Sequence, residues 1–100
     1  EKYQYNPTNV PNQDFTITAN GNEFLIRIRT FRGIAYADVS VNGVLTNTAM
    51  RCVANTPIFT DEVNRMADGV FMFKCLGDDY PSYEDFNTDN CRFVLVPFGE

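Results

Sequence analysis

Five acidic residues lie close together near the end of the chain: Asp78, Asp79, Glu84, Asp85 and Asp89. Clustered carboxylates can bind calcium, and a pair of them can act as general acid and base in glycoside hydrolysis. The spacing differs from the D-x-D-x-D-G pattern of a calcium loop, and freely hydrated acids lack the raised pKa that hydrolysis requires. We therefore expect a solvated acidic loop with no metal, no cofactor and no catalytic residue.

The three cysteines, Cys52, Cys75 and Cys91, are widely spaced, and the chain has no histidine. A cysteine nucleophile would lack its usual base, and a structural zinc site would have only cysteine and carboxylate ligands. Glycine-rich phosphate-binding patterns and Gly-x-Ser-x-Gly are also absent from the sequence, so we expect a non-enzymatic protein. Because Cys75 and Cys91 fall in strand-like runs, buried and reduced thiols are favoured over a disulfide, as after synthesis in a reducing cytoplasm.

The charge distribution limits the partners that the chain can bind. Its 100 residues carry a net charge of -5. Residues 1–50 contain four acids and four bases, whereas residues 51–100 contain nine acids and four bases. Most of the surface would therefore repel nucleic acid and anionic membranes, and no apolar run approaches the roughly 18 residues of a membrane span.

Alternating apolar residues predict a β-hairpin followed by a third strand. Residues 15–18 and 24–29 alternate on either side of Asn20-Gly21, a dipeptide typical of tight hairpin turns. Residues 34–41 alternate in the same way, with Asp38 on the outer face, where it could form a surface ion pair with Arg27 or Arg29.

The remaining segments are expected to cover this hairpin. Asn42-Gly43 predicts a second turn, followed by a polar stretch and a short strand near residues 50–53. Residues 60–69 could form a short helix, capped by Thr60 and ended by Gly69. Residues 70–76 and 91–98 predict two more strands, and residues 1–12 an extended arm. The expected fold is one mostly-β domain over residues 1–100: a small antiparallel sandwich or partly open barrel with at most one short helix.

Two features predict an interface with other proteins. The acidic loop carries aromatic residues, and the last strand is apolar on both faces, so that a partner subunit could cover one of them. The alternative for Tyr80 and Phe86 is that they fold back on the core. The candidate interface residues are Tyr80, Tyr83, Phe86, Val94, Val96 and Phe98.

Several motifs, in this order, resemble those of a known family. They are Pro-Asn-Gln-x-Phe at residues 11–15, the turn at Gly21, Asn-Gly-Val-Leu at residues 42–45, the acidic stretch 79–86 and the apolar residues 93–96. Over residues 11–98 the chain resembles the plug domain of the baseplates of small contractile-tailed phages.

The resemblance implies a non-enzymatic virion protein near the central hub of the tail baseplate, synthesised in the bacterial host cytoplasm. It would plug or scaffold the axial tube and contact other tail and baseplate hub proteins. Copies around such an axis would form a homo-oligomer, a trimer or a hexamer. The alternative is a small β module that binds a carbohydrate or a host protein through the aromatic loop.

Overall fold

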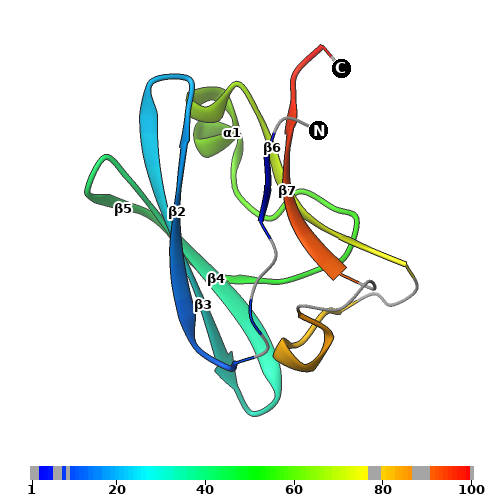
Figure 1. Cartoon of the computed structure of the whole chain (residues 1–100). Coiled ribbons are helices and arrows are strands. Elements are labelled where there is room, and N and C mark those ends of the chain that lie inside the picture. Colours follow the sequence, from blue (N-terminus) through cyan, green and yellow to red (C-terminus); the bar gives the residue numbers. More distant parts are fainter. Residues whose placement is uncertain (1–2, 6–7, 9, 77–79, 87–90, 100) are drawn as a thin grey trace.

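The computed structural model shows two antiparallel β-sheets packed face to face (Figure 1). It describes residues 3–5, 8, 10–76, 80–86 and 91–99. The strands are β1 (Tyr3–Tyr5), β2 (Gln13–Ala19), β3 (Asn22–Phe31), β4 (Ile34–Val41), β5 (Val44–Arg51), β6 (Gly69–Cys75) and β7 (Cys91–Pro97). The helices are α1 (Asp61–Ala67) and the 3-10 helix η1 (Tyr83–Asp85). The predicted mostly-β sandwich with one short helix is confirmed.

The four-stranded sheet has the order β2-β3-β4-β5, so each strand pairs with its neighbour along the chain. Both residues of Asn20-Gly21 have positive φ, 52° and 76°, and Asn42-Gly43 repeats this conformation with 52° and 86°. Asparagine and glycine adopt positive φ at low cost, and such turns match the twist of a hairpin. The predicted hairpin and third strand are confirmed, with Ile26 opposite Val39.

The prediction for residues 44–53 is wrong, because residues 44–51 form one edge strand, β5. Its register with β4 shifts beside Asp38, where Ala49 has a φ of 54°. The Asp38 carboxylate accepts hydrogen bonds from the Ala49 N–H at 2.7 Å and from the Thr48 hydroxyl at 3.1 Å. The bulge turns the Ala49 N–H away from the hydrogen bonds between β4 and β5, and the Asp38 carboxylate accepts it instead. The bulge interrupts the alternation by which a strand is recognised.

Asp38 also forms an ion pair with Arg29, one of the two predicted partners. The pair is not a surface contact as predicted, because Asp38 is only 5% exposed beneath the bulge and the arginine. Burial alone raises the pKa of Asp38, but the Ala49 N–H, the Thr48 hydroxyl and the Arg29 guanidinium outweigh it. Together these donors hold the pKa of Asp38 below its usual value.

The three-stranded sheet has the order β1-β7-β6, with the last strand in the middle. Within the predicted arm, β1 pairs with β7, and the ring of Tyr5 stacks on Phe15 of the facing sheet with centroids 3.9 Å apart. On the other side, Ala54 and Pro57 form isolated bridges to β6. The central position of β7 explains why its sequence is apolar on both faces.

The predicted helix is confirmed and begins after Thr60, but the Thr60 side chain makes no capping hydrogen bond, and Asp68 rather than Gly69 ends the helix. Asp68 adopts the left-handed conformation with a φ of 52°. Gly69 instead begins β6 against β7, where an added Cβ would lie 2.6 Å from the carbonyl oxygen of Val96. This glycine is needed for the close approach of two backbones and not for its own conformation.

Three asparagine side chains attach the hairpin turns to the end of α1. Asn20 and Asn22 donate to the carbonyl oxygen of Met66 at 3.1 and 2.9 Å. Asn42, in the next turn, donates to Oδ1 of Asn22 at 2.9 Å. These bonds satisfy a carbonyl that a helix end leaves without an intrahelical partner, and they place α1 beside the β2–β3 turn (Figure 1).

Phenylalanine rings fill the space between the sheets. Phe93 of β7 contacts Phe15 of β2 and Phe71 and Phe73 of β6, with centroids 5.3, 5.8 and 5.1 Å away. Phe71 and Phe73 are fully buried, and Cys75 packs half-buried against the same core.

Replacing Asp38 with asparagine tests the charged support of the bulge. We expect D38N to lower the free energy of unfolding at pH 7 by about 1–3 kcal/mol, because the ion pair and the charge-assisted bonds are lost. Since the pKa of Asp38 is lower in the folded than in the unfolded state, its contribution is complete above the usual value of 3.8 and is lost as the pH falls below it.

Urea unfolding at pH 7 and pH 3 measures this effect, and the difference between wild type and D38N should shrink at pH 3. D14N is the matched control, because Asp14 is exposed and lies 3.8 Å from Arg27. We expect D14N to change stability by less than about 1 kcal/mol. An equal loss in both variants, or a loss in D38N that is independent of pH, would contradict the assignment.

Candidate protein-binding surface

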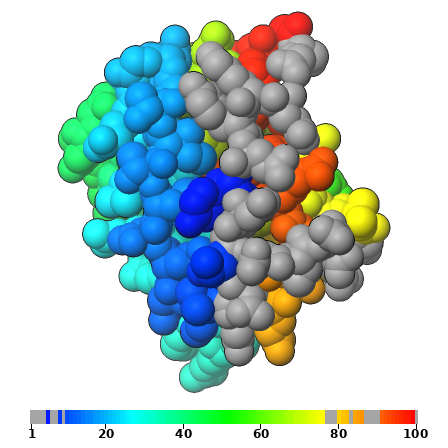
Figure 2. Space-filling view, in the orientation of Figure 1, coloured from blue at the N-terminus to red at the C-terminus, as the bar shows by residue number. Residues whose placement is uncertain are grey.

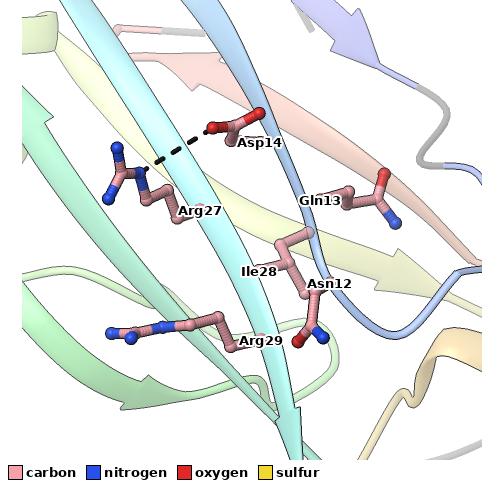
Figure 3. A pocket seen from close by; sticks show the side chains of 6 residues that line it. All are labelled: Asn12, Gln13, Asp14, Arg27, Ile28 and Arg29. Atoms are coloured by element: carbon pink, nitrogen blue, oxygen red, sulfur yellow. Dashed lines mark ion pairs between the residues drawn. The ribbon is translucent and has the colours of Figure 1, made fainter.

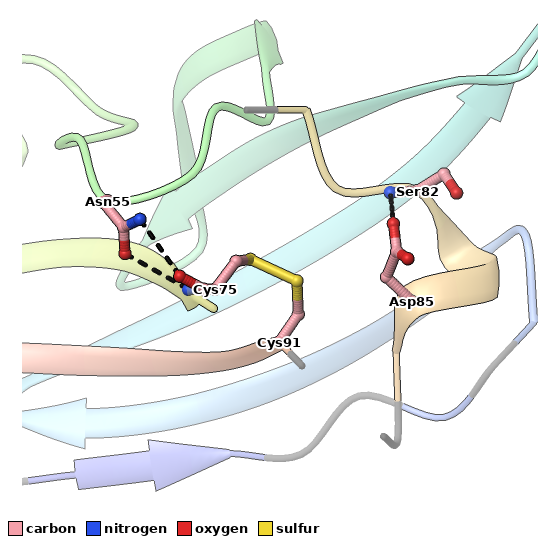
Figure 4. The surroundings of a disulfide bond; sticks show 5 residues. All are labelled: Asn55, Cys75, Ser82, Asp85 and Cys91. Carbon is pink, nitrogen blue, oxygen red and sulfur yellow. Dashed lines mark hydrogen bonds between the residues drawn. A yellow bond between two sulfur atoms is a disulfide. The ribbon is translucent and has the colours of Figure 1, made fainter. Parts of the chain in front are cut away.

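A disulfide between Cys75 and Cys91 joins the two ends of the acidic loop (Figure 4). The two residues stand opposite one another in β6 and β7, with Cα atoms 4.2 Å apart. The Asn55 side chain bonds both the N–H and the carbonyl of Cys75 at 3.1 Å, so these groups point away from β7. Cys75 and Cys91 thus form a non-hydrogen-bonded pair, the kind of pair in which the facing Cα atoms of antiparallel strands lie closest.

The prediction of reduced thiols is therefore wrong for Cys75 and Cys91. The register of two strands separated by a loop decides this pairing, and strand patterns alone do not reveal register. Cys52 is free and buried, as predicted.

Phe86 holds the loop against the core. Its side chain is fully buried, and its ring stacks on Phe73 with centroids 5.3 Å apart. Before it, η1 is closed by Ser82, whose N–H donates to the Asp85 carboxylate at 3.0 Å (Figure 4). Phe86 therefore folds back on the core, which was the alternative to an exposed interface residue. The side chain of Tyr83, like all of Asp78, Asp79 and Asp89, lies outside the described part of the chain.

Tyr80 ends a row of arginine and tyrosine side chains across the outer face of the four-stranded sheet. Arg29 stands opposite Tyr36, and Tyr36 stands opposite Arg51. The Arg51 guanidinium lies over the Tyr80 ring, 4.1 Å from its centroid, and Tyr80 is 55% exposed. Arginine and tyrosine are enriched among the residues that contribute most to protein interfaces. We call these four residues the arginine–tyrosine row.

The surface is hollowed along this row. A cavity of about 370 Å³ is lined by Asn12, Arg29, Thr30, Phe31, Tyr36 and Ala49. A neighbouring cavity of about 330 Å³ continues along β2 and β3 and is lined by Asn12, Gln13, Asp14, Arg27, Ile28 and Arg29 (Figure 3). Aromatic rings, guanidinium groups and amides together suit the side chains of a protein partner, with carboxylates on the arginines and apolar groups on the rings.

The last strand supplies only part of the candidate interface. Val94 is fully buried by the chain itself, so its side chain needs no partner subunit to cover it. Val96 is half-buried, and Phe98, beyond the end of β7, is 49% exposed. Of the candidate residues, Tyr80 and Phe98 are thus the well-exposed ones, whereas Phe86 and Val94 belong to the interior.

The most exposed large apolar residues of the described chain were not among the candidates: Leu76 (79% exposed), Val44 (66%), Phe31 (62%) and Leu45 (61%). Val44 and Leu45 directly follow the Asn42-Gly43 turn, and Phe31 directly precedes the Arg32-Gly33 turn. Side chains at a hairpin end have few neighbours, so their position next to a turn signal could have revealed them.

Within the described residues, no three histidine, cysteine, aspartate or glutamate side chains come together as ligands for a metal ion. None of the helices found there has the length and apolar character needed to cross a membrane.

A family model described as cyanophage baseplate Pam3 plug gp18 matches residues 3–97. The match spans β1 to β7, with both sheets and the acidic loop. Comparison with curated proteins gives no match.

Counting reactive thiols tests the pairing of the cysteines. Cys52 is 1% exposed, and burial raises its pKa to about 12, so the folded protein should not react with Ellman's reagent at pH 8. In denaturant the unreduced chain should show one thiol and the reduced chain three. Three thiols without a reductant would contradict the disulfide.

Alanine substitutions separate the anchoring aromatic residue from the exposed one. We expect F86A to destabilise the fold by about 3–5 kcal/mol, because it leaves a cavity against Phe73. Y80A should cost about 1 kcal/mol or less, because it removes one exposed contact with Arg51. Guanidinium unfolding measures both variants, and equal effects would contradict the anchoring role of Phe86.

Proposed function

Because the chain belongs to the cyanophage baseplate Pam3 plug gp18 family, we propose that it plugs or scaffolds the central hub of a contractile-tail baseplate. It acts as a non-enzymatic structural protein of the virion, through contacts with other tail and baseplate hub proteins. The family match over residues 3–97 is the observation that carries this proposal.

The surface of the molecule supports a binding role. The arginine–tyrosine row lies beside two open cavities, and Phe31 is exposed at their edge. Such a surface offers large contact area and directed hydrogen bonds to a protein partner. The net charge of -5 disfavours adhesion to the DNA that a phage tail conducts.

We assign partner contacts to Tyr80 and Phe98, with Val96 at the margin. Copies arranged about the tail axis are related by rotational symmetry, as a trimer or a hexamer. An aromatic platform for a carbohydrate or host protein is disfavoured, because Phe86, one of its three rings, is buried in the core.

Baseplate reconstitution tests the proposal. The chain is expressed with the tail and baseplate proteins encoded beside it, and assembled particles are isolated and analysed by electron microscopy and mass spectrometry. We expect wild type in the particles, and Y80A/F98A to be incorporated at least tenfold less, because two exposed aromatic contacts are lost. V10A, which truncates an exposed apolar residue elsewhere, is the control. Complete particles that never contain the chain would overturn the proposal.

A further inference from the structure

The four-stranded sheet has an open edge on each side. Among the described residues, β2 and β5 are its outer strands, each paired on one side only. β5 carries no proline and no charged residue before Arg51, and none of its residues is buried. Figure 2 shows its surface at the left border of the molecule. Natural edge strands usually carry charges, prolines or bulges that discourage pairing. β5 has the bulge beside Asp38 but no proline, and on either side of the bulge its backbone is a template for another strand.

The directions of the two edges make them complementary. Each successive pair from β2 to β5 is antiparallel, so β2 and β5 run in opposite directions. A rotation about an axis parallel to the strands keeps these directions. It therefore brings β5 of one copy beside β2 of the next as an antiparallel pair. A contact between two different edges repeats from copy to copy and can close into a ring.

The charges of the two edges agree with this arrangement. In an antiparallel pair, the start of β2 meets the end of β5, so Asp14 can stand opposite Arg51 of the next copy. Asp14 and Arg51 are both exposed. Among the described residues, Asp14 lies 3.8 Å from Arg27, and the Arg51 guanidinium lies over the Tyr80 ring. The same register sets Phe15 opposite Met50, and both of these side chains face the core. At these two positions, on the Arg51 side of the bulge, the faces of the joined sheets would match.

We propose that β5 of one copy pairs with β2 of the next, so that the four-stranded sheets of neighbouring copies form a continuous sheet. The backbone hydrogen bonds of the two edges provide affinity, and the Asp14–Arg51 pair fixes the register. This inference deepens the proposed function, on which it rests for the rotational arrangement of copies.

Charge exchange tests the contact. Self-association of the purified chain is measured by light scattering over a concentration series. We expect D14R and R51D each to weaken association about tenfold, because like charges then face each other. The double variant D14R/R51D, with the net charge of wild type, should restore association. E23R is the control. It changes the net charge as much as D14R does, but it lies in β3, away from both edges. We expect E23R to associate like wild type, within about twofold.

Hydrogen exchange gives a second measurement that needs no substitution. On association, amides of β2 and β5 should become protected, while those of residues 80–86 should change little. A wild-type chain that stays monomeric at its highest soluble concentration, a double variant as weak as the single ones, or protection confined to residues outside β2 and β5 would each overturn the strand pairing.

The two proposals can fail separately. A chain that enters reconstituted baseplates but does not pair through β2 and β5 would overturn the strand pairing and leave the proposed function standing. A chain that associates through these edges but is absent from complete baseplates would overturn the proposed function.

Discussion

The packing of Phe93 between the two sheets is the contact on which the rest of the structure depends. Its ring meets Phe15 in the four-stranded sheet and Phe71 and Phe73 in its own sheet. From these rings the contacts extend to Phe24, Phe59 and Tyr5, and through Phe73 to Phe86 in the acidic loop. Each edge-to-face or offset pair adds about 0.5–1.5 kcal/mol beyond the area it buries. One aromatic layer thus joins both sheets, the N-terminal strand and the loop.

This layer leaves the outer face of the four-stranded sheet free for other interactions. The inner face takes the buried apolar residues of β2, β3 and β4, whereas Asp14, Arg27 and Arg29 lie on the outer face. Asp38 is the exception, since it is buried on the outer side and supports the bulge of β5. Its carboxylate orients Arg29 at the edge of the cavity that Tyr36 and Phe31 line. A buried charge therefore links the shape of the edge strand to the surface offered to partners.

In the part of the acidic loop that the structure describes, three contacts hold the chain and the Tyr80 ring stays exposed. The Cys75–Cys91 disulfide closes its ends, Phe86 enters the core, and the Tyr80 ring lies against Arg51. A closed loop of this length has less conformational entropy to lose on folding and on binding, by about 3 kcal/mol in the chain-entropy model.

Features encoded within a few residues were predictable from the sequence. The Asn-Gly turns and the alternation of β2 to β4 predicted the hairpins, and the local sequence of residues 60–69 predicted a helix there, although its two ends differ from the predicted caps. Family motifs spread along the chain predicted the baseplate plug family. These signals work because turn conformation, strand alternation and helix ends each depend on neighbours in the chain.

Only the tertiary structure decided the features that depend on residues far apart. The bulge that interrupts the strand pattern of β5 depends on Asp38 of β4. The disulfide depends on the register of β6 and β7, and the burial of Phe86 depends on Phe73. The arginine–tyrosine row likewise joins β3, β4, β5 and the loop. The sequence by itself determined β2, β3, β4, β6 and β7 and the family to which the chain belongs. Which side chains meet, and so which aromatic residues remain at the surface, was decided by how the strands pair and pack, because pairing register is a long-range property.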